Sequence, residues 1–457
     1  MITTADTVAH RAGFHRIDGE LCCDGFPLSE VARRCATPSY VYSSELIREK
    51  YRRYDAAFGN APHLVCYAAK ANSTMGVLGL LAAEGAGFDI VSQGELMRVL
   101  HAGGDPKRIV FSGVGKSRSD IAAGLAAGIR CFNVESLAEL ERIDAIAGEL
   151  DVVAPVSVRV NPDVDPHTNA RIATGLKSAK FGIALRDVKD AYRRAASLAN
   201  LRIEGISCHI GSQVSDLRAY EEMTEVLFGL LRELDADGIR VAHVDFGGGA
   251  AIAYREDDPE LAPETLVARL VALTKEKAPY PVEILIEPGR SIVAEAGVLL
   301  TTVEYVKPME ADADCCIVDA SMTELIRPTL YDAWHQIEPV GHPARAGAKP
   351  VNIVGPVCES SDWLGSRRKI EVAAGDVLAV RTAGAYGMSM ASNYNSRPLP
   401  AEVMIENGRI AMLRERQNVL ELFAGERPPE GAKQGPLDAE AFERVNRVRL
   451  AFLSATP

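Results

Sequence analysis

Three residues with chemically active side chains, Lys70, His209 and Glu287, stand at the ends of short apolar runs. A lysine at the end of a strand, among small residues, can have a lowered pKa and form a Schiff base with a carbonyl compound. A surface lysine is the simpler interpretation of Lys70 taken alone. A carboxylate that ends an apolar run, as Glu287 does, is expected to be buried and to need a partner. That partner is either the nearby Arg290 or the protonated nitrogen of a bound ring.

The elements that would position these residues follow from an alternation of short apolar runs with alanine- and leucine-rich stretches of helical spacing. The apolar runs are Val65–Ala69, Phe88–Val91, Ile109–Ser112, Cys131–Val134, Val156–Val160, Ile203–Ile210, Val241–Phe246 and Val282–Ile286. Eight strands that alternate with helices are typical of a (β/α)8 barrel of the TIM type, although a doubly wound sheet could produce the same count. We therefore predict an α/β barrel over residues 36–290.

The carboxyl ends of barrel strands gather on one face, where active sites form. In this sequence those ends carry polar residues or glycine, namely Lys70, Asp89, Ser112, Asn133, Asn161, His209, Gly247–Gly249 and Glu287. The loops after strands seven and eight often bind phosphate. Here they contain Gly247–Gly249 and Glu287–Arg290, and glycine lets backbone N–H groups approach an anion closely. A tight turn remains the alternative for the glycine run.

The carboxyl-terminal third has a different pattern. After about residue 290, runs such as Leu299–Val306 follow one another without helical stretches between them. Ala401–Leu413 is expected to be a hairpin, because Asn407-Gly408 suits a type I′ turn. We predict a second domain formed by residues 1–35 and 291–457, a mostly antiparallel β-barrel or sandwich with a short helical tail.

Composition narrows the class of protein. The chain has 457 residues and a formal net charge of -12, which argues against nucleic acid and anionic membranes as partners. No apolar run approaches the ~18 residues of a membrane span, and the amino terminus has no signal-peptide pattern. The nine cysteines include no Cys-x-x-Cys pair, so we expect reduced thiols in a cytoplasmic protein and no metal site.

Eight motifs in order along the chain resemble the fold-type III pyridoxal-phosphate decarboxylases, and among them the diaminopimelate decarboxylase family. The motifs are Tyr67–Asn72, Gly87–Ser92, Ser207–Gln213, Asp245–Gly249, Glu287–Ser291, Ile326–Tyr331, Gly355–Ser360 and Ser392–Pro398. The resemblance extends from about Phe14 to about Phe423. It implies pyridoxal 5'-phosphate as cofactor and decarboxylation of meso-2,6-diaminopimelate to L-lysine and CO2, the last step of lysine biosynthesis.

The resemblance also implies roles for individual residues. Lys70 would bind the cofactor covalently, His209 would stack on its ring, and Cys358 would donate a proton. The expected cofactor-binding residues are Lys70, Asp89, His209, Ser212, Gly248, Gly249, Glu287, Gly289, Arg290 and Tyr386. The expected substrate-binding residues are Arg290, Arg327, Tyr331, Glu359 and Tyr386. A homodimer with shared active sites would follow, because the family places Cys358 and Glu359 in the partner subunit's site.

General chemistry agrees with a decarboxylase that acts on this type of substrate. A carboxylate beside a pyridine nitrogen keeps the ring protonated, which strengthens it as an electron sink. Arginine binds a carboxylate bidentately, so Arg327 beside Glu359 suits a distal amino-acid head group. An ion pair with Glu324 is the alternative for Arg327. Two alternatives remain open: a decarboxylase of secondary metabolism that acts on another acidic or carrier-tethered amino acid, and a catalytically inactive homologue.

Overall fold

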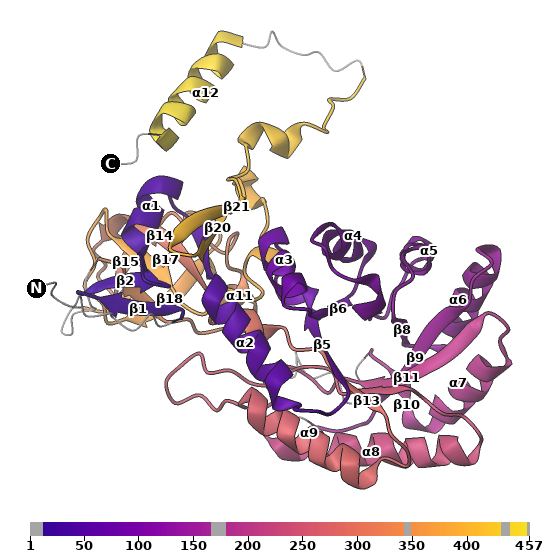
Figure 1. The fold of residues 1–457 in the computed structure, drawn as a ribbon. Helices are drawn as coiled ribbons and strands as arrows, with labels where there is room; N and C mark the ends of the chain where they lie inside the picture. The colour runs from indigo at the N-terminus through magenta and orange to yellow at the C-terminus, as the bar shows by residue number, and fades with distance from the viewer. Residues whose placement is uncertain (1–11, 166–179, 342–348, 431–438, 455–457) are drawn as a thin grey trace, which may run out of the picture. The chain divides into compact units, whose positions relative to one another are not determined.

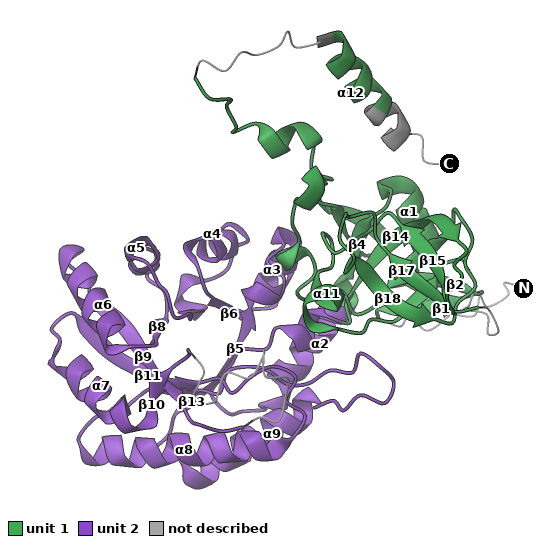
Figure 2. Cartoon of the chain, turned by 180° about the vertical axis from the view of Figure 1, so that it is seen from behind, with its two compact units in different colours: residues 1–45, 295–457 green, residues 46–294 purple. Residues whose placement is uncertain are grey.

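The structure is a computed structural model that describes residues 12–165, 180–341, 349–430 and 439–454. The chain forms two compact units, which Figure 2 draws in different colours. Unit 1 comprises residues 1–45 and 295–457, and unit 2 comprises residues 46–294. Among the described residues, no helix has the length and apolar character needed to cross a membrane.

Unit 2 is a closed barrel of eight parallel strands. The strands are β5 (His63–Ala68), β6 (Gly87–Ile90), β7 (Ile109–Phe111), β8 (Cys131–Val134), β9 (Ala154–Asn161), β11 (Leu201–Cys208), β12 (His243–Asp245) and β13 (Glu283–Ile286). Each pairs with the next, and β13 pairs with β5, where Leu285 stands opposite Leu64. This closure confirms the predicted (β/α)8 barrel and excludes the open doubly wound sheet. A short strand, β10 (Ile183–Ala184), runs parallel to the last two residues of β9, Val160 and Asn161.

Helices surround the barrel strands and cover their outer sides (Figure 1). The helices of this unit are α2 (Ser44–Ala57), α3 (Met75–Ala83), α4 (Gln93–His101), α5 (Arg118–Ala127), α6 (Leu137–Glu149), α7 (Leu185–Ser197), α8 (Leu217–Ala236), α9 (Pro263–Lys277) and α10 (Arg290–Val293). In α7 the buried residues Val188, Ala191, Tyr192 and Ala195 follow the spacing of one helix face. All eight residues of β9 are buried, because a barrel strand is covered on both sides.

Serine side chains begin three of these helices. Ser92 and Ser136 accept hydrogen bonds from the backbone N–H groups of Glu95 and Glu139, the third residues of α4 and α6. Ser117 forms a reciprocal capping box with Asp120 at the start of α5. Each cap satisfies N–H groups that have no partner inside the helix, so the loops that leave the barrel strands turn into helices at defined residues.

Unit 1 is built on a mostly antiparallel sheet with the strand order β18-β17-β15-β14-β4-β20-β21. These strands are β4 (Ser39–Ser43), β14 (Gly297–Lys307), β15 (Asp314–Val318), β17 (Val351–Val354), β18 (Trp363–Arg368), β20 (Ala401–Glu406) and β21 (Arg409–Arg414). Two further strands, β16 (Ile337–Pro339) and β19 (Val377–Val380), pair with each other, and β19 also pairs with β14. The predicted β domain is therefore present. The hairpin of β20 and β21 turns at Asn407 and Gly408, whose φ angles are +50° and +69°.

The first residues of the chain complete this unit. They form the small sheet of β1 (Phe14–Ile17), β2 (Glu20–Cys23) and β3 (Phe26–Pro27), followed by α1 (Leu28–Cys35). Strand β4 lies between β14 and β20 in the large sheet, so unit 1 extends to Glu45, beyond the residue 35 expected from the sequence. Helices α11 (Arg327–Tyr331) and α12 (Ala439–Ser454) and the short 3-10 turn Tyr394–Ser396 also belong to unit 1.

Candidate active site

Lys70 and Asp89 form an ion pair at the carboxyl ends of β5 and β6. The two strands are in register, so that Ala68 stands opposite Asp89, and Lys70 lies in the 3-10 turn that follows β5. The Lys70 ammonium group donates to Oδ2 of Asp89. The Asp89 side chain is fully buried, whereas 37% of the Lys70 side chain is exposed. The pair therefore holds a partly accessible amine at the barrel mouth.

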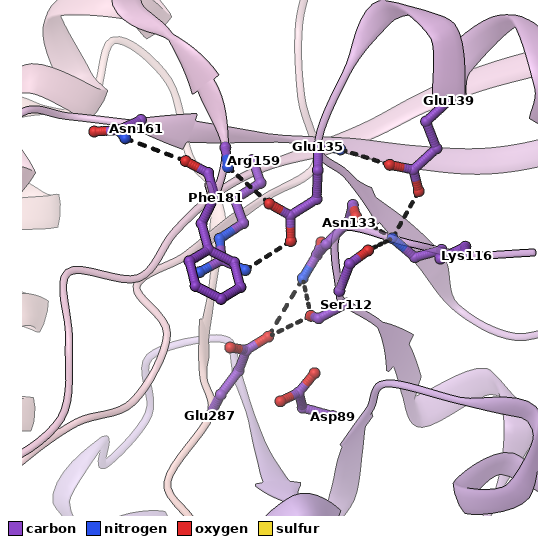
Figure 3. A network of polar contacts seen from close by, with 12 residues as sticks. Asp89, Ser112, Lys116, Asn133, Glu135, Glu139, Arg159, Asn161, Phe181 and Glu287 are labelled. Carbon is purple, nitrogen blue, oxygen red and sulfur yellow. Dashed lines mark hydrogen bonds and ion pairs between the residues drawn. The ribbon is translucent and has the colours of Figure 1, made fainter. Parts of the chain in front are cut away.

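Two more carboxylates, Glu287 and Asp245, lie in the same part of the barrel. Figure 3 shows Glu287 pointing toward Ser112 and Asn133, with Asp89 close by. Asn133 Nδ2 donates to Glu287 Oε1 at 3.3 Å and Ser112 Oγ donates to it at 3.5 Å. Burial raises the pKa of Glu287 well above its usual range, and the charges of Asp245 and Asp89 raise it further. Burial likewise raises the pKa of Asp245, which lies within hydrogen-bond reach of Glu287.

Asp245 was not named as a site residue from the sequence. Its position offered a signal, because it stands directly before Phe246 and the glycine run, at the end of a barrel strand. Oδ1 of Asp245 accepts a hydrogen bond from the Gly247 N–H at 2.9 Å. Oδ2 of Asp245 and Oδ1 of Asp89 have no hydrogen-bond partner among the described residues. The barrel mouth therefore has an excess of buried acceptor atoms.

A second polar layer supports this cluster, and sequence reasoning named none of its four charged residues. Arg159 on β9 donates to Glu135 at 2.7 Å, and Lys116 donates to Glu139 at 2.7 Å (Figure 3). Lys116 also donates to the backbone oxygen of Asn133 at 2.6 Å. Both ion pairs are almost fully buried, so each charge depends on its partner. These contacts connect the loops that follow β7 and β8 with each other and with strand β9.

His209 follows β11 and is a half-buried, neutral side chain. Burial lowers its pKa well below the usual range, and the charges of Arg159 and Lys70 lower it further. The Gly248 N–H donates to His209 Nδ1 at 3.3 Å, so this nitrogen accepts and the ring proton belongs on Nε2. The imidazole is therefore a flat, uncharged surface beside the glycine run.

The predicted glycines allow backbone segments to approach one another closely. A Cβ atom at Gly248 would lie 2.1 Å from the backbone oxygen of Glu287. A Cβ atom at Gly249, whose φ is +104°, would lie 2.0 Å from the backbone oxygen of Gly211. At Gly289 an added Cβ would lie 3.0 Å from the Cβ atoms of Ala68 and Ala71. Side chains are excluded at the first two positions by backbone atoms that cannot move independently.

Arg290 begins α10 and reaches two hydroxyl groups on neighbouring loops. Its Nη1 donates to the hydroxyl of Tyr254 at 2.8 Å, and its Nη2 and Nε lie 3.2 and 3.3 Å from Ser212 Oγ. A guanidinium, two hydroxyls and a glycine run from adjacent loops suit an anion such as a phosphate. Tyr254 was not named from the sequence, because it lies nine residues from the strand end and carries no local motif.

The other predicted site residues, Arg327, Tyr331, Cys358, Glu359 and Tyr386, belong to unit 1. Cys358 and Glu359 are exposed and follow β17. The Cys358 N–H donates to Asn395 Oδ1 at 3.0 Å. Arg327 and Tyr331 stand at the two ends of α11, and Tyr386 has a left-handed φ of +55°.

Arg327 is buried, and its Nη1 lies 2.9 Å from Nε2 of His335. An ion pair with Glu324 is the alternative role for Arg327 that the sequence leaves open. The carboxylate of Glu324 accepts from the Ser321 N–H at 2.8 Å and from the Thr323 hydroxyl at 3.0 Å. Burial raises the pKa of Glu324, and hydrogen bonds from Ser321 and Thr323 oppose that rise.

Comparison with known proteins identifies the family. Residues 44–294 match the family described as pyridoxal-dependent decarboxylase, pyridoxal binding domain. Diaminopimelate decarboxylase of Pseudomonas aeruginosa is 49% identical over 421 residues, which cover 92% of this chain and 99% of that protein. The Vibrio cholerae diaminopimelate decarboxylase is 47% identical and covers 89% of this chain and 96% of its own length. The chain belongs to the diaminopimelate decarboxylase family.

Solved structures of diaminopimelate decarboxylases share this fold. The enzyme from Helicobacter pylori, complexed with L-lysine, aligns with a TM-score of 0.83 and 38% identity over 87% of this chain and 99% of that one. The enzyme from M. jannaschii, also in complex with L-lysine, aligns with a TM-score of 0.86 and 37% identity over 91% of this chain and 98% of that one. Both likenesses extend over the two units.

The residues of unit 2 fit pyridoxal phosphate, the cofactor of this decarboxylase family. The buried acceptor atoms of Asp89 and Asp245 and the raised pKa of Glu287 describe a region that needs more positive charge than Lys70 supplies. A protonated ring nitrogen would supply such a charge. The guanidinium of Arg290, the hydroxyl groups of Ser212 and Tyr254 and the N–H groups of the glycine run are the kinds of donor that suit a phosphate. Both halves of the cofactor therefore have a matching set of side chains.

Proposed function

We propose that this chain decarboxylates meso-2,6-diaminopimelate to L-lysine and CO2 with pyridoxal phosphate, the last step of lysine biosynthesis. The observation that carries the proposal is the buried cluster of Glu287, Asp245 and Asp89 beside Lys70, in a member of the diaminopimelate decarboxylase family. Decarboxylases of this type need a carboxylate at the ring nitrogen, whereas an arginine there weakens the electron sink.

The residues that would hold the cofactor divide by the part that each contacts. Lys70 would bind it covalently, Glu287 would hold the proton on its ring nitrogen, and His209 would lie against its ring. Phosphate binding is assigned to Ser212, Gly248, Gly249, Gly289 and Arg290. Asp89 would keep the Lys70 amine in place, and Tyr386 of unit 1 would be a further contact. When bound, the cofactor supplies a conjugated ring that accepts the electron pair left by departing CO2.

The chain's own residues then control charge and protons. Asn133 and Ser112 donate to Glu287 and hold its carboxylate in one position, so that it does not have to reorganise during the reaction. His209 remains neutral and adds no charge that would compete with the proton held by Glu287. Cys358 Sγ would deliver a proton to the carbon that has lost its carboxylate. An exposed thiol suits this role better than a buried one, since it is accessible to a reacting partner.

Recognition of the substrate's distal head group is assigned to Arg327, Tyr331, Glu359, Arg290 and Tyr386. Arg327 would bind the distal carboxylate by paired N–H bonds, and Glu359 would accept from the distal ammonium group. Because paired N–H bonds to a carboxylate are strong and depend on its geometry, a substrate that lacks this carboxylate should bind poorly. This requirement separates diaminopimelate from simple diamine precursors.

We further propose that the protein is a homodimer in which Cys358 and Glu359 of one subunit serve the active site of the other. Both side chains are exposed in the single chain, as residues that act across a subunit boundary would be. A cytoplasmic setting is also proposed. All nine cysteines fall within the described residues and are free thiols, which suits a reducing compartment.

The test is CO2 release from meso-diaminopimelate by purified protein with added pyridoxal phosphate, with Lys70→Ala as the matched control. We expect CO2 and L-lysine in equal amounts from the wild type, and neither from the control. A visible cofactor absorbance band without CO2 release would overturn the substrate assignment and leave the cofactor site standing. Another acidic or carrier-tethered amino acid would then be the next substrate class to measure.

A further inference from the structure

His335 is a fully buried histidine that contacts Arg327 through one ring nitrogen and the backbone through the other. Its Nε2 lies 2.9 Å from Nη1 of Arg327, and its Nδ1 lies 2.9 Å from the backbone oxygen of Arg381. None of its surface is exposed. The local fold brings the pair together, because α11 ends at Asp332 in a left-handed conformation (φ 53°) and the chain turns back toward Arg327.

The two contacts determine where the ring proton is. A carbonyl oxygen can only accept a hydrogen bond, so Nδ1 must carry the proton. A guanidinium nitrogen can only donate, so Nε2 must be the unprotonated acceptor. The ring in this arrangement is therefore neutral, with its proton on Nδ1. The opposite tautomer would break both bonds at once.

The surroundings of His335 also favour the neutral ring. The charged groups on the packed elements include Arg327 on α11, Arg368 on β18, Arg381 after β19 and Glu338 on β16. Arg368 Nη2 donates to the backbone oxygen of His335 at 2.7 Å, and its guanidinium lies 4.6 Å from the ring centre of Trp334. The Arg381 guanidinium lies 3.7 Å from Glu338 on β16. A protonated imidazole would add a further positive charge next to Arg327.

We propose that His335 is a positioning residue that holds the guanidinium plane of Arg327 for the distal carboxylate of the substrate. The proposal rests on the substrate-binding role assigned to Arg327. A carboxylate accepts two parallel N–H bonds only when it lies in the plane of the guanidinium. Arginine has many side-chain conformations, and a contact that selects one of them before binding lowers the cost of binding. His335 itself touches neither substrate nor cofactor in this role.

Two substitutions of His335 separate the contact with Arg327 from the packing of the ring. In His335→Gln the side-chain oxygen can reach the position of Nε2 and accept from Arg327. In His335→Asn the shorter side chain reaches the Arg381 carbonyl but not Arg327. We expect His335→Asn to raise the KM for meso-diaminopimelate about tenfold, the effect of losing one hydrogen bond to a charged group, with kcat within about threefold. His335→Gln should return the KM to within about threefold of the wild type.

Arg327→Lys distinguishes failure of this inference from failure of the substrate assignment. If Arg327→Lys leaves the KM unchanged, Arg327 does not bind the distal carboxylate, and the inference about His335 is overturned as well. If Arg327→Lys raises the KM while His335→Asn does not, only the inference is overturned. An equal loss of kcat in the Asn and Gln variants would also overturn it, since that indicates general damage to the fold.

A spectroscopic measurement on the wild-type protein needs no variant that might fail to fold. Nitrogen-15 NMR of histidine-labelled protein distinguishes protonated from unprotonated ring nitrogens, and the His335 signals are assigned by their absence in His335→Gln. We expect a neutral ring with the proton on Nδ1. A proton on Nε2, or on both nitrogens, at neutral pH would overturn the proposal.

Discussion

Tyr394 donates its hydroxyl to the carboxylate of Glu359, with 2.8 Å between the two oxygens. The next residue, Asn395, accepts the N–H of Cys358 at 3.0 Å. Two adjacent residues of the turn Tyr394–Ser396 thus hold the two adjacent residues to which substrate binding and proton donation are assigned. The hydrogen bond to Glu359, followed by the charge of that carboxylate, raises the pKa of Tyr394, so the hydroxyl stays protonated and able to donate.

Replacing Tyr394 with phenylalanine should weaken substrate binding more than it slows the chemistry. Glu359 would lose a donor that orients it, and the site is exposed, so the effect should be modest. We expect a rise in KM of about two- to tenfold, which corresponds to one ordinary hydrogen bond. Steady-state kinetics with meso-diaminopimelate provides the measurement. A fall in kcat with an unchanged KM would contradict the role given to Tyr394.

Glu287→Gln should stabilise the cofactor-free protein while it abolishes decarboxylation. The folded protein raises the pKa of Glu287, so between the unfolded value of about 4.3 and the folded value the native state binds more protons than the unfolded state. Stability is therefore lost as the pH rises through that window, and the amide avoids the loss. We expect a melting temperature about 2–4 °C above the wild type at pH 8, with a smaller difference at pH 5. Thermal unfolding without cofactor at both pH values tests this, and a lower melting temperature at pH 8 would contradict it.

Removing one partner of the buried Lys116–Glu139 ion pair should lower the stability of the protein strongly. Lys116→Met leaves a buried carboxylate without its cation, which typically costs about 3–5 kcal/mol of unfolding free energy. The double variant Lys116→Met with Glu139→Gln should recover much of that loss, because no charge remains buried. Arg118→Met is the matched control, since it breaks the exposed pair with Glu149 and should cost under about 1 kcal/mol. Urea unfolding compares the three proteins, and equal losses in the buried and exposed variants would argue against a buried pair.

Gly248→Ala should disrupt the proposed phosphate-binding site. The added methyl group would lie 2.1 Å from the backbone oxygen of Glu287, so the loops after β12 and β13 would have to separate. We expect weaker binding of pyridoxal phosphate, measured by its absorbance, and a loss of stability. Gly229→Ala is the control, because that glycine lies inside α8 with nothing within 4 Å of an added Cβ. The control should gain about 0.5–1 kcal/mol, the usual advantage of alanine over glycine within a helix.

Much of the barrel could be predicted from the sequence because each strand is an apolar run closed by a polar residue. Lys70, Asp89, His209 and Glu287 lie within three residues of such a run, and the structure places each at a strand end of unit 2. Strand β4 was harder to assign, because its pairing with β14 and β20 depends on residues far along the chain. Nothing in the local pattern of Ser39–Ser43 indicates those partners.

The buried charges could not be predicted for a different reason. The run Val156–Val160 is predicted as a barrel strand, but nothing in the run itself indicates a partner for the charge of Arg159. The structure buries it because Glu135, on the loop after β8, compensates its charge. The role proposed for His335 could not be predicted either, because it depends on contacts with Arg327 and with the backbone of Arg381. Only the folded chain brings these residues together.

The position of β4 has a consequence for the order in which the chain can fold. Its neighbours β14 and β20 begin at Gly297 and Ala401. During synthesis, β4 therefore cannot pair on both edges until most of the chain has been made. The barrel, encoded in between, can close during that time. A chain truncated before Ala401 would retain β4 with one edge open, which is a template for aggregation. Nascent chains of this protein should therefore depend on chaperones most strongly while the carboxyl-terminal third is being synthesised.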